Sequence, residues 1–144
     1  MMLARRARRI ALALAFLAVP GALSAAALDI LIDLSEQRME VRRDGVIVGD
    51  WPVSTARRGK VTPTGLFVPQ TLVRYHRSTL YDGAPMPWSI FFSGNYAIHG
   101  TTQIEALGAP ASAGCVRLHP DNARQLFELV REVGKRDTLI EIRP

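Results

Sequence analysis

Apolar and polar residues alternate along the chain just after Asp29, and this alternation restricts the fold more than any other feature. The alternating apolar positions are Ile30, Ile32, Leu34, Met39 and Val41. A period of two places such side chains on one face of a β-strand. The dipeptide Asp44-Gly45 then precedes an apolar run at 46–48, which is a strong hairpin signal. We therefore predict that a meander of short antiparallel strands opens the domain.

Further short strands are expected along the rest of the chain. They are predicted at Leu66–Pro69, Phe91-Phe92, Tyr96–Ile98 and Thr138–Ile142. Residues 82–89 (DGAPMPWS) contain two prolines and a glycine. Because these residues interrupt regular structure, we expect a surface loop there.

A helical period appears near the C-terminus. Apolar residues recur at the spacing of one helix face at Ala123, Leu126, Phe127, Val130 and Val133. Pro120 suits the first helical position and Gly134 the position after the end, while His119 is expected to cap the helix rather than to catalyse. The pattern predicts a β-rich α+β fold: a compact domain of antiparallel and mixed strands with one principal helix at about 120–133.

The positive charge lies mainly in the first 27 residues. The chain has 144 residues and a formal net charge of +5, and four arginines fall within 1–27, a segment without acids. The rest of the chain is nearly neutral, so we expect no nucleic-acid partner. The basic start, the apolar run at 10–19 and the small residues at 22–27 predict a signal peptide over 1–27 and export to the periplasm or cell envelope. Ten apolar residues are fewer than the ~20 of a spanning helix, so we expect no stable membrane span after the signal peptide is cleaved. The alternative is that this segment is retained as an N-terminal anchor.

The predicted export changes the interpretation of the single cysteine, Cys115. A lone cysteine in an oxidising compartment forms an intermolecular bond or is a free thiol kept for chemistry, and the alternative is a small buried apolar residue. His99 is the candidate base for such a thiol. If the chain is extended after Cys115, Arg117 shares its face and can favour the thiolate and bind a carboxylate. Gly114 permits unusual backbone angles, and the N–H groups of Gly114 and Cys115 are candidate oxyanion donors.

From Asp29 onward the chain resembles the L,D-transpeptidase (YkuD-type) catalytic domain of bacterial cell-wall enzymes. The segments that carry the resemblance are 33–37 (DLSEQ), 52–55 (PVST), 62–65 (TPTG), 96–101 (YAIHGT) and 112–118 (SAGCVRL). The last two, in this order and at this separation, are highly specific for the family. The resemblance implies a catalytic domain over 28–144.

The resemblance also implies a reaction on the tetrapeptide stems of peptidoglycan. Cys115 would attack the carbonyl between the diamino acid at position three and the terminal D-Ala. D-Ala would leave, and an amine of a second stem or of a cell-wall-anchored protein would resolve the thioester. The ring of His99 would be oriented by the carbonyl of Gly100. The family often has histidine or another bulky or basic residue where this chain has Ala113, which is expected to tune the cleft.

Four residues are candidates for substrate contact: Arg117, Tyr96, Ser112 and Trp88. For Tyr96 and Trp88 the alternative is an ordinary packing role. We expect no metal, because no His, Cys and carboxylate set has ligand spacing, and no cofactor. We also expect a monomer. A hydrolase on the same scaffold (an L,D-carboxypeptidase or endopeptidase) and a murein-binding module without turnover remain open.

Overall fold

The computed structural model describes residues 26–144. The predicted signal peptide over 1–27 therefore lies, except for its last two residues, outside the described part. Within that part, no helix has the length and apolar character needed to cross a bilayer.

The first sheet contains both the first and the last strand of the described chain. Its order is β3 (Val46–Pro52), β2 (Arg38–Arg43), β1 (Leu28–Asp33), β9 (Thr138–Arg143) and β4 (Gly65–Phe67). The first three strands form the predicted antiparallel meander, and β1 runs parallel to β9. Asp44 and Gly45 have φ values of +49° and +80°. Positive φ at both central residues is typical of a type I′ turn, which confirms the hairpin.

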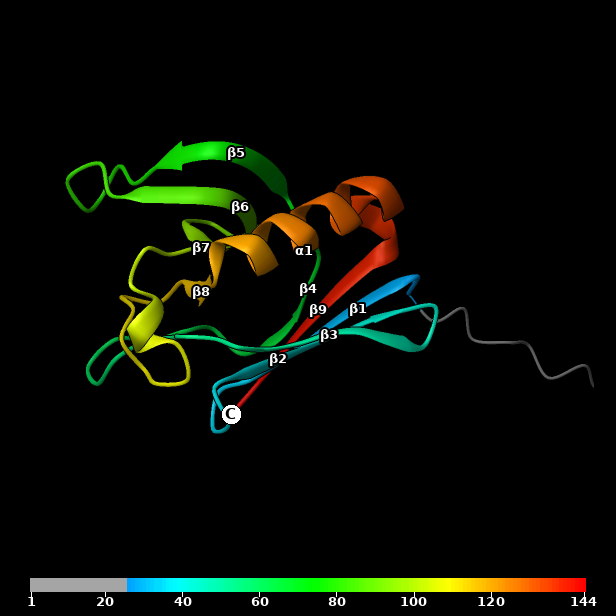
Figure 1. Cartoon of the computed structure of the whole chain (residues 1–144), viewed down its shortest axis with the longest axis horizontal. Coiled ribbons are helices and arrows are strands. Elements are labelled where there is room, and N and C mark those ends of the chain that lie inside the picture. Colours follow the sequence, from blue (N-terminus) through cyan, green and yellow to red (C-terminus); the bar gives the residue numbers. More distant parts are fainter. Residues whose placement is uncertain (1–25) are drawn as a thin grey trace, which may run out of the picture.

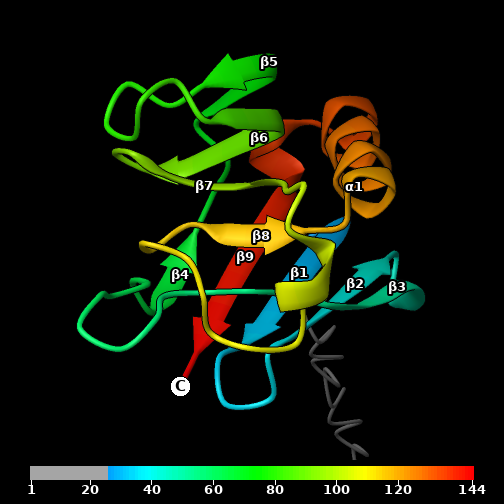
Figure 2. The ribbon, with the colours of Figure 1, turned by 60° about the vertical axis from the view of Figure 1, so that its left-hand side comes forward.

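The second sheet carries the segments that resemble the family most closely. Its order is β5 (Thr71–Arg77), β6 (Pro85–Ser93), β7 (Tyr96–Gly100) and β8 (Val116–Leu118). The first three strands are antiparallel, and β7 and β8 are parallel. Figures 1 and 2 show the two sheets as separate layers, with α1 (Pro120–Val133) beside β6 and β7.

The expected surface loop at 82–89 is wrong in its second half, because β6 begins at Pro85. In this part of β6 the strand pairs with β5, and β7 joins it only from Ile90. The prolines lack an N–H group, which is tolerated where a strand has no neighbour on that side. The partner strand β5 was not predicted, because its residues are mostly polar and it lies at the edge of the sheet.

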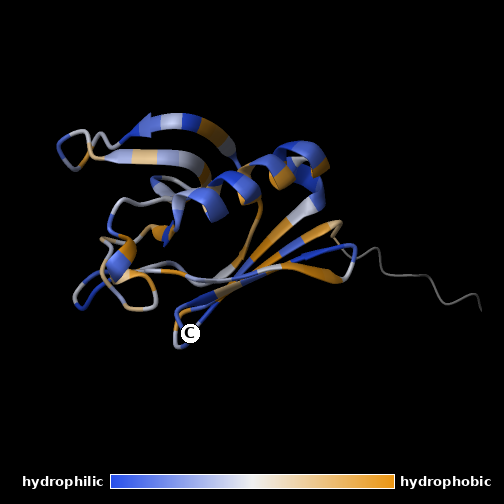
Figure 3. Ribbon diagram, in the orientation of Figure 1, coloured by the Kyte–Doolittle hydropathy of each residue, from blue (hydrophilic) through white to orange (hydrophobic). Residues whose placement is uncertain are grey.

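The predicted helix is confirmed with its bounds and its caps. Nδ1 of His119 accepts a hydrogen bond from the N–H of Asp121 at 3.1 Å, and Gly134 follows the last turn. The predicted apolar face is buried except for Val133, which is partly buried. Figure 3 shows hydrophilic and hydrophobic residues alternating along α1, as expected for an amphipathic helix. Two short 3-10 helices, η1 (Ile104–Ala106) and η2 (Lys135–Asp137), complete the described elements.

One hydrophobic core joins the two sheets and the helix. Its fully buried members come from both layers and include Leu28, Ile30, Ile32, Met39, Val41, Ile90, Ile98, Val116, Leu118, Leu126 and Ile140. Burial of a side chain of this size contributes about 1.5–3 kcal/mol, so this cluster is the main source of stability. The observed architecture is the predicted mixed, β-rich fold with one principal helix.

Candidate active site

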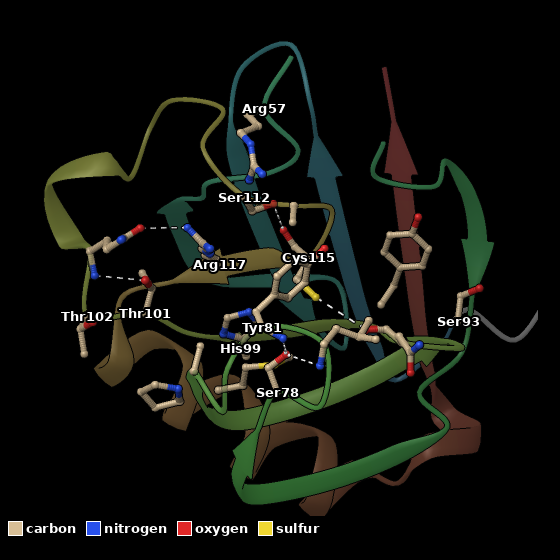
Figure 4. Close-up of a pocket in the computed structure, with 18 residues that line it drawn as sticks. Arg57, Ser78, Tyr81, Ser93, His99, Thr101, Thr102, Ser112, Cys115 and Arg117 are labelled. Atoms are coloured by element: carbon tan, nitrogen blue, oxygen red, sulfur yellow. Dashed lines mark hydrogen bonds between the residues drawn. The ribbon is translucent and has the colours of Figure 1, made fainter. Parts of the chain in front are cut away.

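A cavity of about 540 Å³ is lined by residues of the second sheet and of the loops around it. Its walls come from the hairpin between β5 and β6, from β7, and from the loop that leads into β8. Figure 4 shows His99, Cys115 and Arg117 among the side chains around it. Fold topology therefore brings together residues that are sixteen or more positions apart in the sequence.

Cys115 stands directly before β8 and faces this cavity. Val116 and Leu118 are fully buried, while Cys115 and Arg117 lie on the opposite, cavity side of the strand. The sulfur lies 3.7 Å from the carbonyl oxygen of Asn95, to which the thiol donates. Burial raises the pKa of the thiol, and the backbone amide of Ala97 and the charge of Arg117 offset this in part. The group is therefore a neutral thiol at neutral pH.

His99 lies on β7, and only 6% of its surface is exposed. Its Nδ1 is 2.7 Å from the carbonyl oxygen of Gly100. Because a carbonyl only accepts, Nδ1 carries the proton and Nε2 keeps its lone pair. Burial lowers the pKa of His99 to about 4; the Gly100 carbonyl opposes this shift, and the charges of Arg117 and His76 add to it. The imidazole is therefore a neutral base at neutral pH.

The thiol and the imidazole face the same cavity without a hydrogen bond between them. Figure 4 labels both side chains among those that surround the cavity. Within residues 26–144 the hydrogen-bond partner of the thiol is Asn95, and that of the ring is Gly100. Catalytic hydrogen bonds are often long in unliganded enzymes and tighten when the substrate binds.

Ser112 holds the loop before Cys115 in shape. Its hydroxyl donates to the carbonyl of Cys115 at 2.6 Å and accepts from the N–H of Gly114 at 3.0 Å. Ser112 is buried and lines the cavity, but both hydrogen bonds of its hydroxyl stay within the loop, which does not favour the expected substrate contact. Nor does it favour Gly114 as an oxyanion donor, because a paired N–H is not free for substrate. Among the described residues, no chain atom accepts from the N–H of Cys115.

Gly114 itself is required by the packing of this loop. Its φ is +140°, and an added Cβ would lie 2.6 Å from Cε1 of Tyr96 and 2.8 Å from the carbonyl oxygen of Val61. A side chain at this position would push Tyr96 or the backbone away from the cavity.

Two buried polar residues that sequence reasoning missed support the same loop. The hydroxyl of Thr62 donates to the carbonyl of Gly114 at 2.8 Å and accepts from the N–H of Ala56 at 3.0 Å. Gln37 donates from Nε2 to the hydroxyl of Thr55 and accepts the Thr55 N–H at Oε1. Both residues belong to segments that carry the family resemblance. A polar residue within such a short segment was the sequence signal that could have indicated their structural role.

The remaining predicted residues divide between the cavity and the core. Tyr96 and Arg117 line the cavity, and Nη1 of Arg117 donates to Gln103 at 3.1 Å. Gly100 packs tightly against the start of α1, where an added Cβ would lie 3.2 Å from Cα of Pro120. Ala113 also lines the cavity, where its small side chain leaves room.

Trp88 is not among the residues that line the cavity, so the structure does not favour the expected substrate contact, which stays a prediction. Its ring packs edge-on against Phe127 at 5.4 Å, and the guanidinium groups of Arg74 and Arg124 each lie 5.7 Å from it. The φ of Trp88 is +57°, which departs from an extended strand. Side-chain alternation along β6 therefore does not apply at this residue.

Fold and site together define a class of protein. Within residues 26–144, no group of three or more His, Cys, Asp and Glu side chains is placed to hold a metal ion. A free thiol and a neutral imidazole share one cavity, which is the combination that cysteine-dependent acyl transfer requires. The chain belongs to the L,D-transpeptidase catalytic domain family (YkuD), whose family model matches residues 28–142.

Known proteins resemble this chain in sequence and in fold. It is 28% identical over 120 residues to "Putative L,D-transpeptidase YqjB" of Bacillus subtilis (strain 168), an alignment that covers 74% of this chain and 68% of the relative. An L,D-transpeptidase structure from Mycobacterium smegmatis superposes with a TM-score of 0.73 at 20% identity, covering 83% of this chain and 59% of the other. L,D-transpeptidase 3 from Mycobacterium tuberculosis, in complex with a faropenem-derived adduct, gives 0.73 at 16% identity, covering 82% and 60%. The chain thus spans about three-fifths of those two solved structures, and the likeness to them shows the fold.

Proposed function

We propose that this protein is an L,D-transpeptidase that acts on peptidoglycan stem peptides with Cys115 as its nucleophile. The observation that carries the proposal is the shared cavity of Cys115 and His99 in a domain of this family. We place the protein in the periplasm or cell envelope, where peptidoglycan lies, as a monomer exported through residues 1–27.

The first half of the reaction releases D-Ala. Nε2 of His99 takes the proton of the Cys115 thiol as the sulfur attacks the carbonyl between the third stem residue and D-Ala. The oxygen of this carbonyl gains negative charge, which the N–H of Cys115 stabilises. The bond from this carbon to the D-Ala nitrogen then breaks, His99 returns the proton to the leaving amine, and a thioester remains.

The second half transfers the acyl group. His99 takes a proton from the amine of a second stem, or of a cell-wall-anchored protein, as that amine attacks the thioester. The carbon–sulfur bond breaks, the proton returns to the sulfur, and an amide bond forms. Water in place of the amine would give hydrolysis. The reaction needs no cofactor.

The resting state matters for this mechanism. Burial disfavours both the thiolate of Cys115 and the imidazolium of His99. The free protein therefore holds a neutral pair, and proton transfer accompanies the attack on bound substrate. Arg117 lies on the cavity side of β8, two residues after Cys115, and supports the thiolate that forms during the attack.

The decisive experiment follows products by mass spectrometry after incubation with disaccharide–tetrapeptides. Release of D-Ala together with a 3→3 linked dimer supports transpeptidation, and release of D-Ala alone supports a hydrolase. Binding without release indicates a murein-binding module. C115S serves as the control: it should fold as the parent does and release no D-Ala, because its hydroxyl is a much weaker nucleophile than a thiol.

A second test uses a β-lactam as a probe of the thiol. The M. tuberculosis relative forms a faropenem-derived adduct. We expect the intact mass of this protein to increase after treatment with faropenem and that of C115S to stay unchanged. An adduct on C115S, or none on the parent protein, would argue against Cys115 as the reactive group.

A further inference from the structure

Two arginines face the active-site cavity from the same end. Arg57 and Arg117 both line it, and no Asp or Glu is among the described residues that do so. Figure 4 shows the side chain of Arg57 extending toward Ser112 and Arg117. This end of the cavity is therefore strongly cationic.

The position of Arg57 is set by the loop that carries the reactive sulfur. The N–H of Arg57 donates to the carbonyl of Ser112 at 2.9 Å, and the preceding residue, Ala56, forms a bridge with Ser112. Ser54 forms a second bridge, to Arg117. The backbone of 54–57 is thus fixed against both Arg117 and the loop before Cys115.

Neither guanidinium has an acidic partner within residues 26–144. Several other arginines do: Arg38 pairs with Asp50, Arg42 with Glu40, Arg43 with Glu132, Arg74 and Arg131 with Glu128, and Arg143 with Asp33. The polar partner of Arg117 is the neutral amide of Gln103. The charge of Arg57 acts against that of Arg117, whose pKa is lowered first by burial and then by this repulsion. Two like charges that face a cavity in this way favour an anionic ligand.

We propose that Arg57 and Arg117 together bind a free carboxylate of the donor stem peptide, which makes Arg57 a specificity-determining residue. This inference rests on the proposed function. A planar guanidinium matches a carboxylate with two parallel hydrogen bonds, and two guanidiniums can bind its two oxygens from different sides. Stems in which this carboxylate is amidated would bind poorly.

Two carboxylates of the donor stem lie on the residues that flank the cleaved bond and fit this chemistry. One is the terminal carboxylate of D-Ala, and the other belongs to the side arm of the diamino acid. Amidation of one at a time distinguishes them, because an amide keeps the shape of the group and removes its charge.

The test compares R57Q with R58Q. Arg58 is the next residue in the chain and does not line the cavity, so R58Q removes the same charge without touching the site. D-Ala release is measured with three stems: unmodified, amidated at the terminus, and amidated on the side arm. With the unmodified stem we expect R57Q to raise KM about tenfold, with little change in kcat, because it loses a charge-assisted hydrogen bond. R58Q should behave as the parent protein does.

The amidated stems decide which carboxylate is bound. For the stem that lacks the bound carboxylate, the parent protein should show the raised KM and R57Q should show no further increase. Equal KM values for R57Q and R58Q, or the same penalty from R57Q on all three stems, would overturn the proposal.

Failure of the proposed function would look different, because the parent protein would release D-Ala from none of the stems. In that case calorimetric titration of the parent protein with the unmodified and amidated stems still tests the carboxylate site. The expected result is weaker binding of one amidated stem and a loss of that difference in R57Q. Equal affinity for all stems would overturn the inference.

Discussion

Gly114 precedes Cys115 in a backbone conformation that other residues rarely adopt. We expect G114A to lower the free energy of unfolding by about 2–4 kcal/mol and to abolish D-Ala release, because its Cβ would displace Tyr96 and the loop. Urea unfolding and product analysis measure the two effects. The control is G45A, where φ is +80° and no atom lies within 4 Å of an added Cβ. It should cost about 1 kcal/mol and keep activity; equal effects of the two substitutions would argue against a clash at Gly114.

The buried imidazole of His99 links stability to pH. Its pKa is lowered from 6.5 to about 4, so the unfolded chain binds a proton more readily than the folded protein does between these values. The stabilisation is present above pH 6.5 and is lost as the pH falls toward 4, by about 3 kcal/mol at most. Urea unfolding of the parent protein and of H99Q at pH 7, 5.5 and 4.5 measures it, and H99Q should lose this part of the pH dependence. H76Q is the control and should retain most of it, because His99 stays buried in this variant.

The thiol of Cys115 should react slowly at neutral pH in the free protein. Burial raises its pKa, and alkylating reagents attack the thiolate. We expect the rate of alkylation by iodoacetamide to rise about tenfold for each pH unit from 7 to 9. Intact-mass measurements over time give the rate, and C115S, which has no cysteine, shows the background. A rate that is already constant at pH 7 would indicate a preformed thiolate and contradict the neutral pair.

Individual site residues could be predicted from the sequence to different extents. The position of Arg117 on the same side of the chain as Cys115 could be predicted, because the alternation of side chains along an extended segment is a local property. The hydroxyl of Ser112 bonds within its own loop, and Trp88, at φ +57°, packs against Phe127 of α1. Neither follows from residue type, because both depend on backbone angles that sequence patterns do not report. The catalytic roles of Cys115 and His99 stay predictions.

At the scale of elements, the segment before β4 supports the loop before β8 through one hydroxyl. We expect T62V to lower the free energy of unfolding by about 1–3 kcal/mol and to reduce D-Ala release, since it leaves the N–H of Ala56 and the carbonyl of Gly114 without their partner. Thr64 lies two residues away and is exposed. T64V is therefore the matched control, with an expected change within about 0.5 kcal/mol. If T62V keeps full activity, this contact does not position the loop.

Elements with strong local patterns were predictable, and those that depend on their neighbours were not. Helix α1 and the hairpin at Asp44-Gly45 follow from apolar spacing and turn residues, which act within a few positions. The prolines of β6 indicated a loop, but a strand forms because β5 pairs with one side while the other side needs no N–H there. Strand β5 in turn exists because β6 lies beside it. Such pairing is a tertiary effect.

At the scale of the whole molecule, the first and last strands of the described residues pair with each other. β1 and β9 pair in parallel at the centre of the first sheet, so segments more than 100 residues apart form adjacent strands. This pairing was not predicted, although strands were expected at both ends. The core between the sheets is shared, because β8 and α1 contribute to the same cluster as β1 and β9. Neither sheet buries its inner face without the other.

This shared core predicts that the two sheets unfold together. The protein has two tryptophans, Trp51 on β3 of the first sheet and Trp88 on β6 of the second. Fluorescence of W88F therefore reports on the first sheet, and that of W51F on the second. In each variant we expect the urea midpoint from fluorescence to coincide with the midpoint from far-UV circular dichroism, since domains of this size usually unfold in one cooperative step. Earlier loss of the Trp51 signal than of the circular dichroism signal in W88F would show that the first sheet opens alone. The candidate active-site cavity, which is lined by the second sheet and its loops, would then not depend on the whole core.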